Sequence, residues 1–302
     1  MSLRTPNPLT NYQTRLDLQR SKERMTDLSN QISSGNRLLR LSDDPTGSAL
    51  VLDFQNSIAI NKQHIDQANR ATSFLKTSET TLSSLDDSLQ RLLELGQQGQ
   101  SDITGSNGRA NIANEVDGIR STILSLANTQ SQGKYLFSGT NTTTQPFTLT
   151  ATGANYAGNG ASINLDITSS TSVSTNIPGN TVFFGAGGQG SSTDMFTQVT
   201  NLRDALTSNN SAGIKTACDN IKNIQSALNN QITDLGGRQA SIEQITTDLG
   251  SYNESLQTIQ NTYQSVDYPT AISEWYQEQT AQQASLSVIS KTGKTNLFDY
   301  LG

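Results

Sequence analysis

Adjacent carboxylates at Asp43 and Asp44 are the first residues in the chain whose types and spacing could do chemistry. Such a pair could bind a metal ion or divide acid and base roles between two groups. However, Pro45 follows directly, and an acidic residue before proline is typical of the start of a helix. Ser42 also fits this turn better than the role of a nucleophile. We therefore interpret Asp44 as an N-cap and Pro45 as the first residue of a helix.

His64 and Cys218 are the only histidine and the only cysteine in the chain. A zinc site or a catalytic triad needs partners that this composition does not supply. A single cysteine also cannot form an internal disulfide. We interpret His64 as lying on the flank of a long helix and Cys218 as a small, half-buried side chain. The composition predicts a protein that is not an enzyme and that needs no cofactor or metal ion.

Two further motifs have structural explanations. The segment Gly187-Gly188-Gln189-Gly190 looks like a phosphate loop, but no Lys-Ser/Thr pair follows it, which favours a flexible connector. Trp275 and Tyr276 could form a ligand platform. Because Trp275 lies at helical spacing from Ile272, packing between subunits is the better interpretation.

The chain has too little apolar material for one thick core, since only 33% of its 302 residues are apolar and 15% are charged. That is enough for seams between long helices, where roughly two positions in seven are apolar. No apolar run approaches the ~20 residues of a transmembrane helix. The first twenty residues do not resemble a cleaved secretory signal either, because they are charged and lack an apolar stretch.

Residues 1–40 carry a net charge of +4, whereas the whole chain carries −6. These basic residues alternate with apolar ones at helical spacing and have no aromatic cluster, which argues against nucleic-acid binding. A solvated helix face, or a face that meets an acidic neighbouring chain, explains them better.

The apolar spacing predicts a mainly α fold with a small β insert. The predicted helices cover about 8–33, 45–99, 112–126, 194–206 and 211–234, then a helix after Gly236-Gly237 that is interrupted at Asp267-Tyr268-Pro269. The helix over 45–99 would be ~80 Å long, which suits a rod. Short strands are expected at 147–150, 163–167 and 181–184.

Eight apolar residues at alternating three- and four-residue spacing form the most regular pattern in the chain. This predicted bundle seam consists of Ile242, Ile245, Leu249, Tyr252, Leu256, Ile259, Tyr263 and Val266. We expect a long antiparallel coiled-coil or helical-bundle rod made from both chain ends. The expected division is an N-terminal assembly helix at 1–42, rod halves at 43–133 and 194–268, a β-rich outer domain at 134–193 and a C-terminal assembly helix at 269–302.

Both ends of the chain are amphipathic, and each apolar stripe is too narrow to stabilise an isolated helix. Folding of the two ends is therefore expected to accompany packing against other copies of the chain. The predicted assembly interface consists of Leu9, Tyr12, Leu16, Trp275, Leu286, Ile289, Leu297, Phe298 and Leu301.

The sequence resembles the flagellin family of bacterial flagella. The segments that carry the resemblance are Gln31–Gly35, Leu41–Pro45, Lys134–Thr140, Gly236–Arg238, Val266–Pro269 and Leu297–Leu301. They cover both ends of the chain and most of its predicted helical parts.

Three details favour the branch of this family that forms the hook–filament junction over the filament subunit. Pro45 follows the Asp pair, residues 146–147 and 176–183 resemble that branch's outer domain, and the final residues lack the usual arginine. The resemblance implies a secreted, self-assembling adaptor exported by the flagellar type III route. The implied partners are other copies of the chain, hook-associated protein 1 on the hook side, flagellin on the filament side and an export chaperone. Neither nucleic acid nor membrane insertion is expected.

Two other functions remain open at the level of sequence. A filament flagellin would polymerise alone into long filaments. An adhesin would use the β insert to bind a surface glycan, so that deletion of residues 140–190 would abolish attachment but leave assembly intact.

Overall fold

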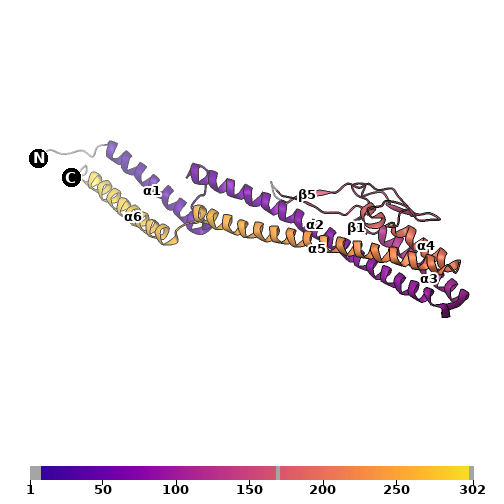
Figure 1. The fold of residues 1–302 in the computed structure, drawn as a ribbon. Coiled ribbons are helices and arrows are strands. Elements are labelled where there is room, and N and C mark those ends of the chain that lie inside the picture. The colour runs from indigo at the N-terminus through magenta and orange to yellow at the C-terminus, as the bar shows by residue number, and fades with distance from the viewer. Residues whose placement is uncertain (1–7, 168–170, 299–302) are drawn as a thin grey trace. The chain divides into compact units, whose positions relative to one another are not determined.

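The computed structural model describes residues 8–167 and 171–298, with side chains described between residues 12 and 290 of these ranges (Figure 1). This part of the chain is mainly helical, with short β-hairpins between the third and fourth α-helices. The predicted fold class, long helices from both chain ends with a small inserted β segment, is confirmed.

The chain forms two compact units. One contains the residues up to Ile60 and from Tyr252 onwards, and the other contains Asn61–Ser251. Helices α2 (Pro45–Gln100) and α5 (Ser211–Gln264) contribute residues to both units.

Helices α1 (Pro8–Ser34) and α6 (Tyr268–Phe298) pack against each other in the first unit. Helix α1 ends where the sequence predicts a left-handed cap, since Gly35 has φ 74° and its N–H donates to the carbonyl of Gln31 at 2.8 Å. A break separates α5 from α6 as predicted, but it covers residues 265–267, because Tyr268 and Pro269 are already the first residues of α6. Both connecting segments are joined by a short antiparallel bridge between Asn36 and Ser265.

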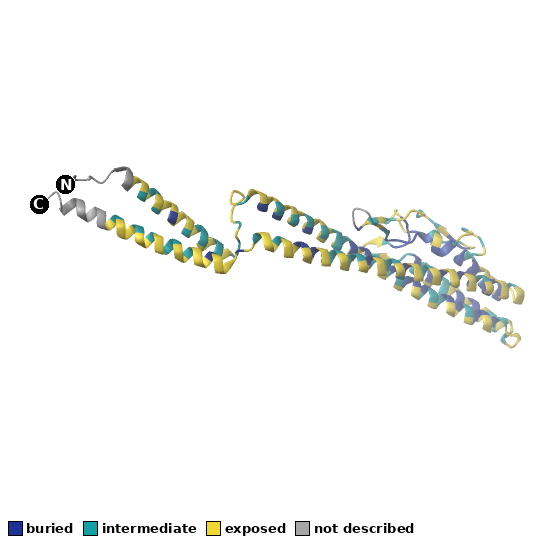
Figure 2. Cartoon of the chain, turned by 60° about the vertical axis from the view of Figure 1, so that its left-hand side comes forward, coloured by how far each residue is buried: buried dark blue, intermediate teal, exposed yellow. Residues whose placement is uncertain are grey.

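The second unit is built around a leucine-rich face of α2 and an isoleucine-rich face of α5, with α3 (Gly105–Ala127) and α4 (Met195–Thr207) packed beside them. One side of each long helix is buried and the other is exposed (Figure 2). A three-residue helical turn, Asp102–Thr104, separates α2 from α3. The fully buried residues include Leu75, Leu82, Leu85, Leu89, Leu92, Val116, Ile123, Leu202, Ile214 and Leu235.

Two glycines allow close approach of helices in this core. A Cβ added at Gly96 would collide with the Sγ of Cys218, and one added at Gly99 would collide with a methyl group of Leu206. Helix α2 therefore meets α4 and α5 at a distance that only glycine permits at these positions. Cys218 is buried in this contact and not half-buried as predicted, and burial raises the pKa of its thiol.

In the described part of the β segment, the strands form three separate two-stranded antiparallel hairpins. They pair β1 (Gln130–Ser131) with β2 (Lys134–Tyr135), β3 (Phe147–Leu149) with β4 (Ala154–Tyr156), and β5 (Asn164–Asp166) with β6 (Ser172–Ser174). Hairpins this short are not stable alone. They pack against the core instead: Phe147 of β3 belongs to a buried aromatic cluster with Phe137, Phe183 and Phe196, and Leu165 of β5 and Val173 of β6 pack against the same core.

The side chain of Asn128, at the end of α3, fixes β3 to the helices. Its Nδ2 donates to the carbonyl of Phe147, and its Oδ1 accepts from the N–H of Phe147, both at 2.9 Å. The amide thus takes the place of a neighbouring strand along the edge of β3.

Two predictions of secondary structure are wrong. Residues 181–184 are not a strand, because Asn180–Phe184 forms a turn of π-helix. Three successive side chains there, Val182, Phe183 and Phe184, are buried, whereas a strand directs neighbouring side chains to opposite faces.

The predicted interruption at Gly236-Gly237 is also absent, because α5 continues through both glycines. Each glycine destabilises a helix by roughly 1 kcal/mol relative to Ala. Burial of Leu235 and Ile242 on either side, and an ion pair between Arg238 and Asp234 at 2.7 Å, support the helix across this point.

We expect Gly96→Ala to lower the free energy of unfolding by about 1–3 kcal/mol, because the new methyl group overpacks the contact with Cys218. Adding Cys218→Ala should recover most of this loss. Gly118→Ala is the matched control, since a Cβ at Gly118 meets no atom within 4 Å. That variant should be more stable, by up to about 1 kcal/mol. Urea denaturation followed by circular dichroism measures each value, and a Gly96→Ala midpoint equal to the wild type would contradict the close packing.

Candidate assembly surface

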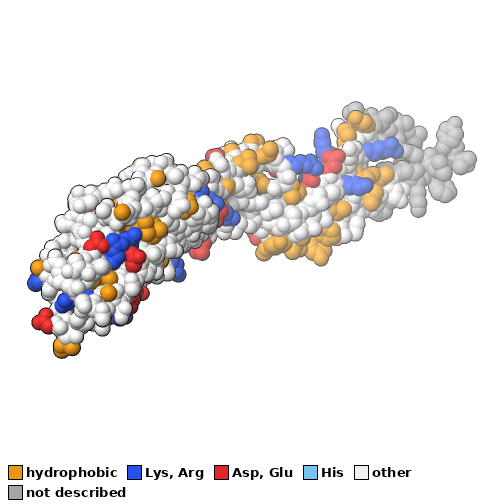
Figure 3. Space-filling model, turned by 90° about the vertical axis from the view of Figure 1, so that its right-hand side faces the viewer, with side chains coloured by type: hydrophobic (Ala, Val, Ile, Leu, Met, Phe, Trp, Pro, Cys, Tyr) orange, Lys and Arg blue, Asp and Glu red, His pale blue; other side chains and the backbone are white. Residues whose placement is uncertain are grey.

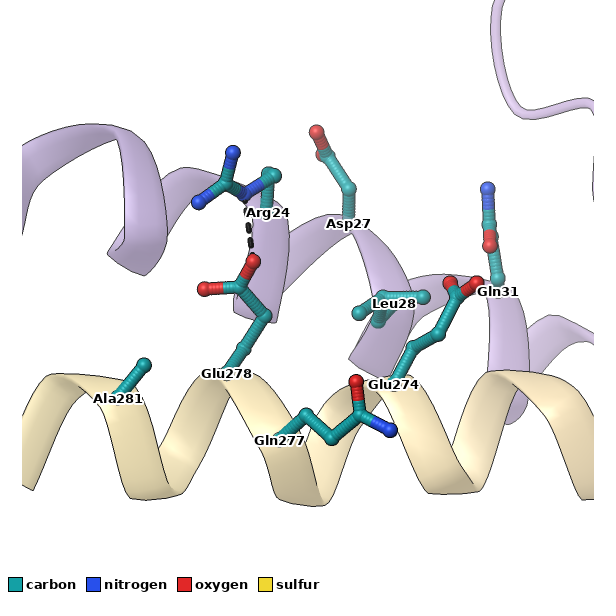
Figure 4. Close-up of a pocket in the computed structure, with 8 residues that line it drawn as sticks. All are labelled: Arg24, Asp27, Leu28, Gln31, Glu274, Gln277, Glu278 and Ala281. Atoms are coloured by element: carbon teal, nitrogen blue, oxygen red, sulfur yellow. Dashed lines mark ion pairs between the residues drawn. The ribbon is translucent and has the colours of Figure 1, made fainter. Parts of the chain in front are cut away.

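A polar contact joins the two terminal helices. The hydroxyl of Ser21 on α1 donates to Oε2 of Glu278 on α6 at 2.6 Å. Nε of Arg24 forms an ion pair with Oε1 of the same carboxylate at 2.7 Å, as Figure 4 shows. Ser21 and Arg24 are three residues apart, so both lie on the same face of α1. Because each oxygen of Glu278 has its own partner, the contact fixes one register of α1 against α6.

The surroundings of Glu278 are strongly acidic. Asp27 and Glu274 line the same cavity of about 530 Å³, where Arg24 is the one basic side chain among the described residues. The Ser21 hydrogen bond is the largest influence that lowers the pKa of Glu278, and Arg24 adds to it against the opposing effect of burial. Glu278 is therefore an ionised acceptor at neutral pH.

The predicted assembly residues lie in different surroundings. Tyr12 is 62% exposed and Leu286 is 50% exposed, while Leu16, Trp275 and Ile289 are half-buried. The side chains of Leu9, Leu297, Phe298 and Leu301 lie outside the described residues.

The exposed side of α6 also presents Ile272 and Tyr276 to solvent. The rings of Trp275 and Tyr276 pack edge to face, with 5.3 Å between their centroids. An apolar side chain at the surface of a helix is available to a partner. The terminal pair therefore keeps unpaired apolar surface on α6.

The head of α2 is held to the tail of α5 through Arg37. Asp44 accepts from the N–H of Gly47 at 2.9 Å, the geometry of an N-cap at Pro45. The same carboxylate pairs with Arg37 at 3.1 Å, and Arg37 also donates to the carbonyl of Tyr263 at 3.1 Å. The hydrogen bond from Gly47, followed by that from Arg37, lowers the pKa of Asp44.

Asp43 does not share this contact. Its Oδ2 accepts from the backbone N–H groups of Leu39 and Arg40 at 3.2 and 2.8 Å. The two carboxylates thus serve different turns. Among the described residues, no three His, Cys, Asp or Glu side chains gather in a way that could hold a metal ion.

The predicted bundle seam is buried over only part of its length. Ile242 is fully buried, and Leu256 and Val266 are 6% and 9% exposed, while Ile245 and Leu249 are half-buried. Tyr252, Ile259 and Tyr263 are exposed by 39–55%. A regular heptad pattern therefore includes side chains that the chain by itself leaves in water.

Sequence reasoning missed the partners of the polar contacts. Ser21, Arg24, Arg37 and Glu278 carry no spacing pattern of their own. The available signal was the opposite charge of Arg24 and Glu278 on helices from opposite ends of the chain. Pairing the two required knowing that these ends pack together.

Acid should weaken the α1·α6 contact. The pKa of Glu278 is below its ordinary value of 4.5. Its stabilising effect is therefore complete above pH 4.5 and is lost as the pH falls through the lowered value. We expect Glu278→Gln to remove this part of the acid dependence of helicity, measured by circular dichroism. Glu274→Gln, at a position without an ion pair among the described residues, should retain it, and identical curves for wild type and Glu278→Gln would contradict the assignment.

Leu256→Asp should lower the free energy of unfolding by several kcal/mol, because it places a charge at a buried position. Tyr252→Asp is the matched control, since Tyr252 belongs to the same seam but is 55% exposed. A surface change of this kind alters stability by only about 0.5 kcal/mol. Equal losses in urea denaturation would contradict the difference in burial.

Known proteins match both helical regions. The profile of the bacterial flagellin N-terminal helical region matches residues 8–142, and that of the C-terminal helical region matches residues 218–301. Hook-associated protein 3 of Escherichia coli K12 is 27% identical over 288 residues, covering 89% of this chain and 90% of that protein. Flagellin 1 of Proteus mirabilis is 28% identical over 134 residues, covering 43% of this chain and 37% of that protein.

A solved structure shares the fold. A flagellar hook-associated protein from Vibrio parahaemolyticus aligns with a TM-score of 0.69 at 20% identity, covering 74% of this chain and 100% of that one. Among the described residues, none of the helices combines the length and apolar character needed to cross a membrane. The two profiles take in all of α1, α2, α3 and α6 and most of α5, and the chain belongs to the flagellin family.

Proposed function

We propose that this protein is the structural adaptor subunit of the hook–filament junction in the bacterial flagellum. The observation that carries the proposal is the extent of similarity. Relatedness to a hook-associated protein 3 spans nearly nine tenths of the chain, whereas relatedness to a flagellin spans less than half. As a member of the flagellin family, the protein has a structural and not an enzymatic role.

Assembly is proposed to occur through the terminal helices. Helices α1 and α6 have one polar contact that sets their register, and α6 keeps exposed apolar side chains such as Tyr276 and Leu286. Burial of that surface between subunits would supply the favourable free energy of assembly. The assembly segments are 1–42 and 269–302, with the helical parts at 43–133 and 194–268 and the β segment at 134–193 as an outer domain.

The protein assembles with flagellar components. We assign it four specific partners: other copies of itself, hook-associated protein 1 on the hook side, flagellin on the filament side and a cytoplasmic export chaperone. The face in Figure 3 is formed mostly by uncharged side chains and backbone, with acidic and basic residues in small groups. Such a surface suits contacts with several protein neighbours better than contact with a polyanion.

Leu286→Asp tests the assembly surface in cells that lack the wild-type gene. The exposed position should leave monomer melting nearly unchanged, while the charge prevents burial of α6, so hooks should lack filaments. Gln283→Asp, at an exposed polar position of the same helix, is the control and should support normal filaments. Full filaments with Leu286→Asp would contradict the proposed interface.

Immunolabelling of the wild type tests the location. Label restricted to the boundary between hook and filament is expected. Label along the whole filament would instead identify a filament flagellin. Polymerisation of the purified protein alone into long filaments would also identify a filament flagellin.

A further inference from the structure

A groove with an apolar floor and a basic rim lies beside α2 in the second unit. Phe74 on α2 and Ile163 and Leu165 at β5 are half-buried in it, and Arg70 and Lys134 stand exposed at its edge. The cavity has a volume of about 350 Å³. Among the described residues, neither Arg70 nor Lys134 makes an ion pair, although the chain as a whole carries a charge of −6.

An acidic side chain that matches the charge of this rim, Glu243, lies on α5. Glu243 is exposed and makes no ion pair with a described residue. Gly236 and Gly250 stand seven residues before and after it, so all three lie on one line along the helix. A Cβ at either glycine would meet nothing within 4 Å.

These glycines are not required by packing within one copy. Each weakens α5 by roughly 1 kcal/mol relative to Ala, yet the space beside it is empty. In contrast, Gly96 and Gly99 are pressed against neighbouring side chains of the same chain. Close approach of another molecule on either side of Glu243 would account for Gly236 and Gly250.

The groove and Glu243 lie on different flanks of the α2·α5 pair. Arg238 on α5 donates to the carbonyls of Ser174 and Asn176, so it faces the β5–β6 hairpin that borders the groove. Glu243 comes five residues later and is rotated by about 140° around the helix axis. It therefore points away from that hairpin.

The groove and Glu243 also lie at the same position along the axis of the α2·α5 pair. Nε2 of Gln239 donates to Oε2 of Glu79 at 2.9 Å, which sets the register of the antiparallel helices. Glu243 comes four residues after Gln239, and because the helices are antiparallel, the position level with it on α2 is four residues before Glu79, at residue 75. Phe74 in the groove is thus level with Glu243, and Arg70 is about 7 Å further along.

We propose that neighbouring copies of this chain contact each other side by side, with Glu243 of one copy placed at the groove of the next and paired with Lys134 and Arg70. Gly236 and Gly250 allow the β1–β2 turn beside Lys134 to approach α5 closely. Two different surfaces meet in this contact, so it repeats around a ring. The apolar floor of the groove strengthens the ion pair by excluding water. The inference rests on the proposed function, because it requires neighbouring copies that lie side by side at the same position along the flagellar axis.

Thiol cross-linking of flagella tests the contact. Lys134→Cys and Glu243→Cys are combined in one chain, and isolated hook–filament structures are treated with a short bifunctional thiol reagent. Bands larger than a dimer are expected, because each copy joins two neighbours through different positions. Either single variant should give no such ladder, and the buried Cys218 is present in every sample.

The control pairs Lys134→Cys with Asn229→Cys. Asn229 lies two heptads from Glu243 on a similar side of α5, about 21 Å away along the axis, and is exposed. An equal ladder in this control, or none with Glu243→Cys although rings contain the protein, would overturn the inference. Absence of even the wild-type chain from the junction would instead overturn the proposed function.

Charge reversal gives a second readout that does not depend on cysteine geometry. Lys134→Glu should reduce the fraction of cells with filaments, and adding Glu243→Lys should restore part of it. Both positions are exposed, so the circular dichroism of the monomers should be unchanged. A double variant no better than Lys134→Glu would contradict the pairing.

Discussion

The narrowness of its apolar stripes is the constraint on which the rest of this protein depends. With one third of its residues apolar, the chain cannot surround a thick core. Helices α2 and α5 instead bury one face each, with leucines on α2 and isoleucines on α5. Gly96 and Gly99 bring the helices close together, so this limited apolar surface makes dense contacts. The opposite faces remain available to other molecules.

Burial of apolar side chains alone does not determine the register of the paired helices. Hydrogen bonds and ion pairs between polar side chains determine it at several points. Arg37 lies between the N-cap carboxylate of α2 and the last carbonyls of α5, where the two helix termini carry opposite partial charges. Gln239 and Glu79 set the register further along, and Asn128 fixes the first strand of the second hairpin to α3. Each contact is directional, so a shift of one residue would leave a polar group without its partner.

The sequence predicted what local periodicity determines. Helix α1, the start of α2 at Pro45, the cap at Gly35 and the interruption before Pro269 follow from spacing and from residues with restricted conformations. It did not predict the π-helical turn at Asn180–Phe184, where contacts with Phe137, Phe147 and Phe196 decide the conformation. It also failed at Gly236-Gly237, since flanking buried residues keep the helix intact. The contacts of Ser21 and Glu278, 257 residues apart, depend on topology that no local pattern contains.

The charge asymmetry has a partial explanation within one chain. The basic N-terminal segment was expected to meet solvent or an acidic neighbour, and Arg24 in fact pairs with Glu278 of the same chain. This pairing neutralises one charge where α1 meets α6 and leaves others, such as Lys22, on the exposed side. Polar contacts between α1 and α6 give the two helices a defined register. The apolar side chains on the outer face of α6 are not needed for this contact, so they stay available to a partner.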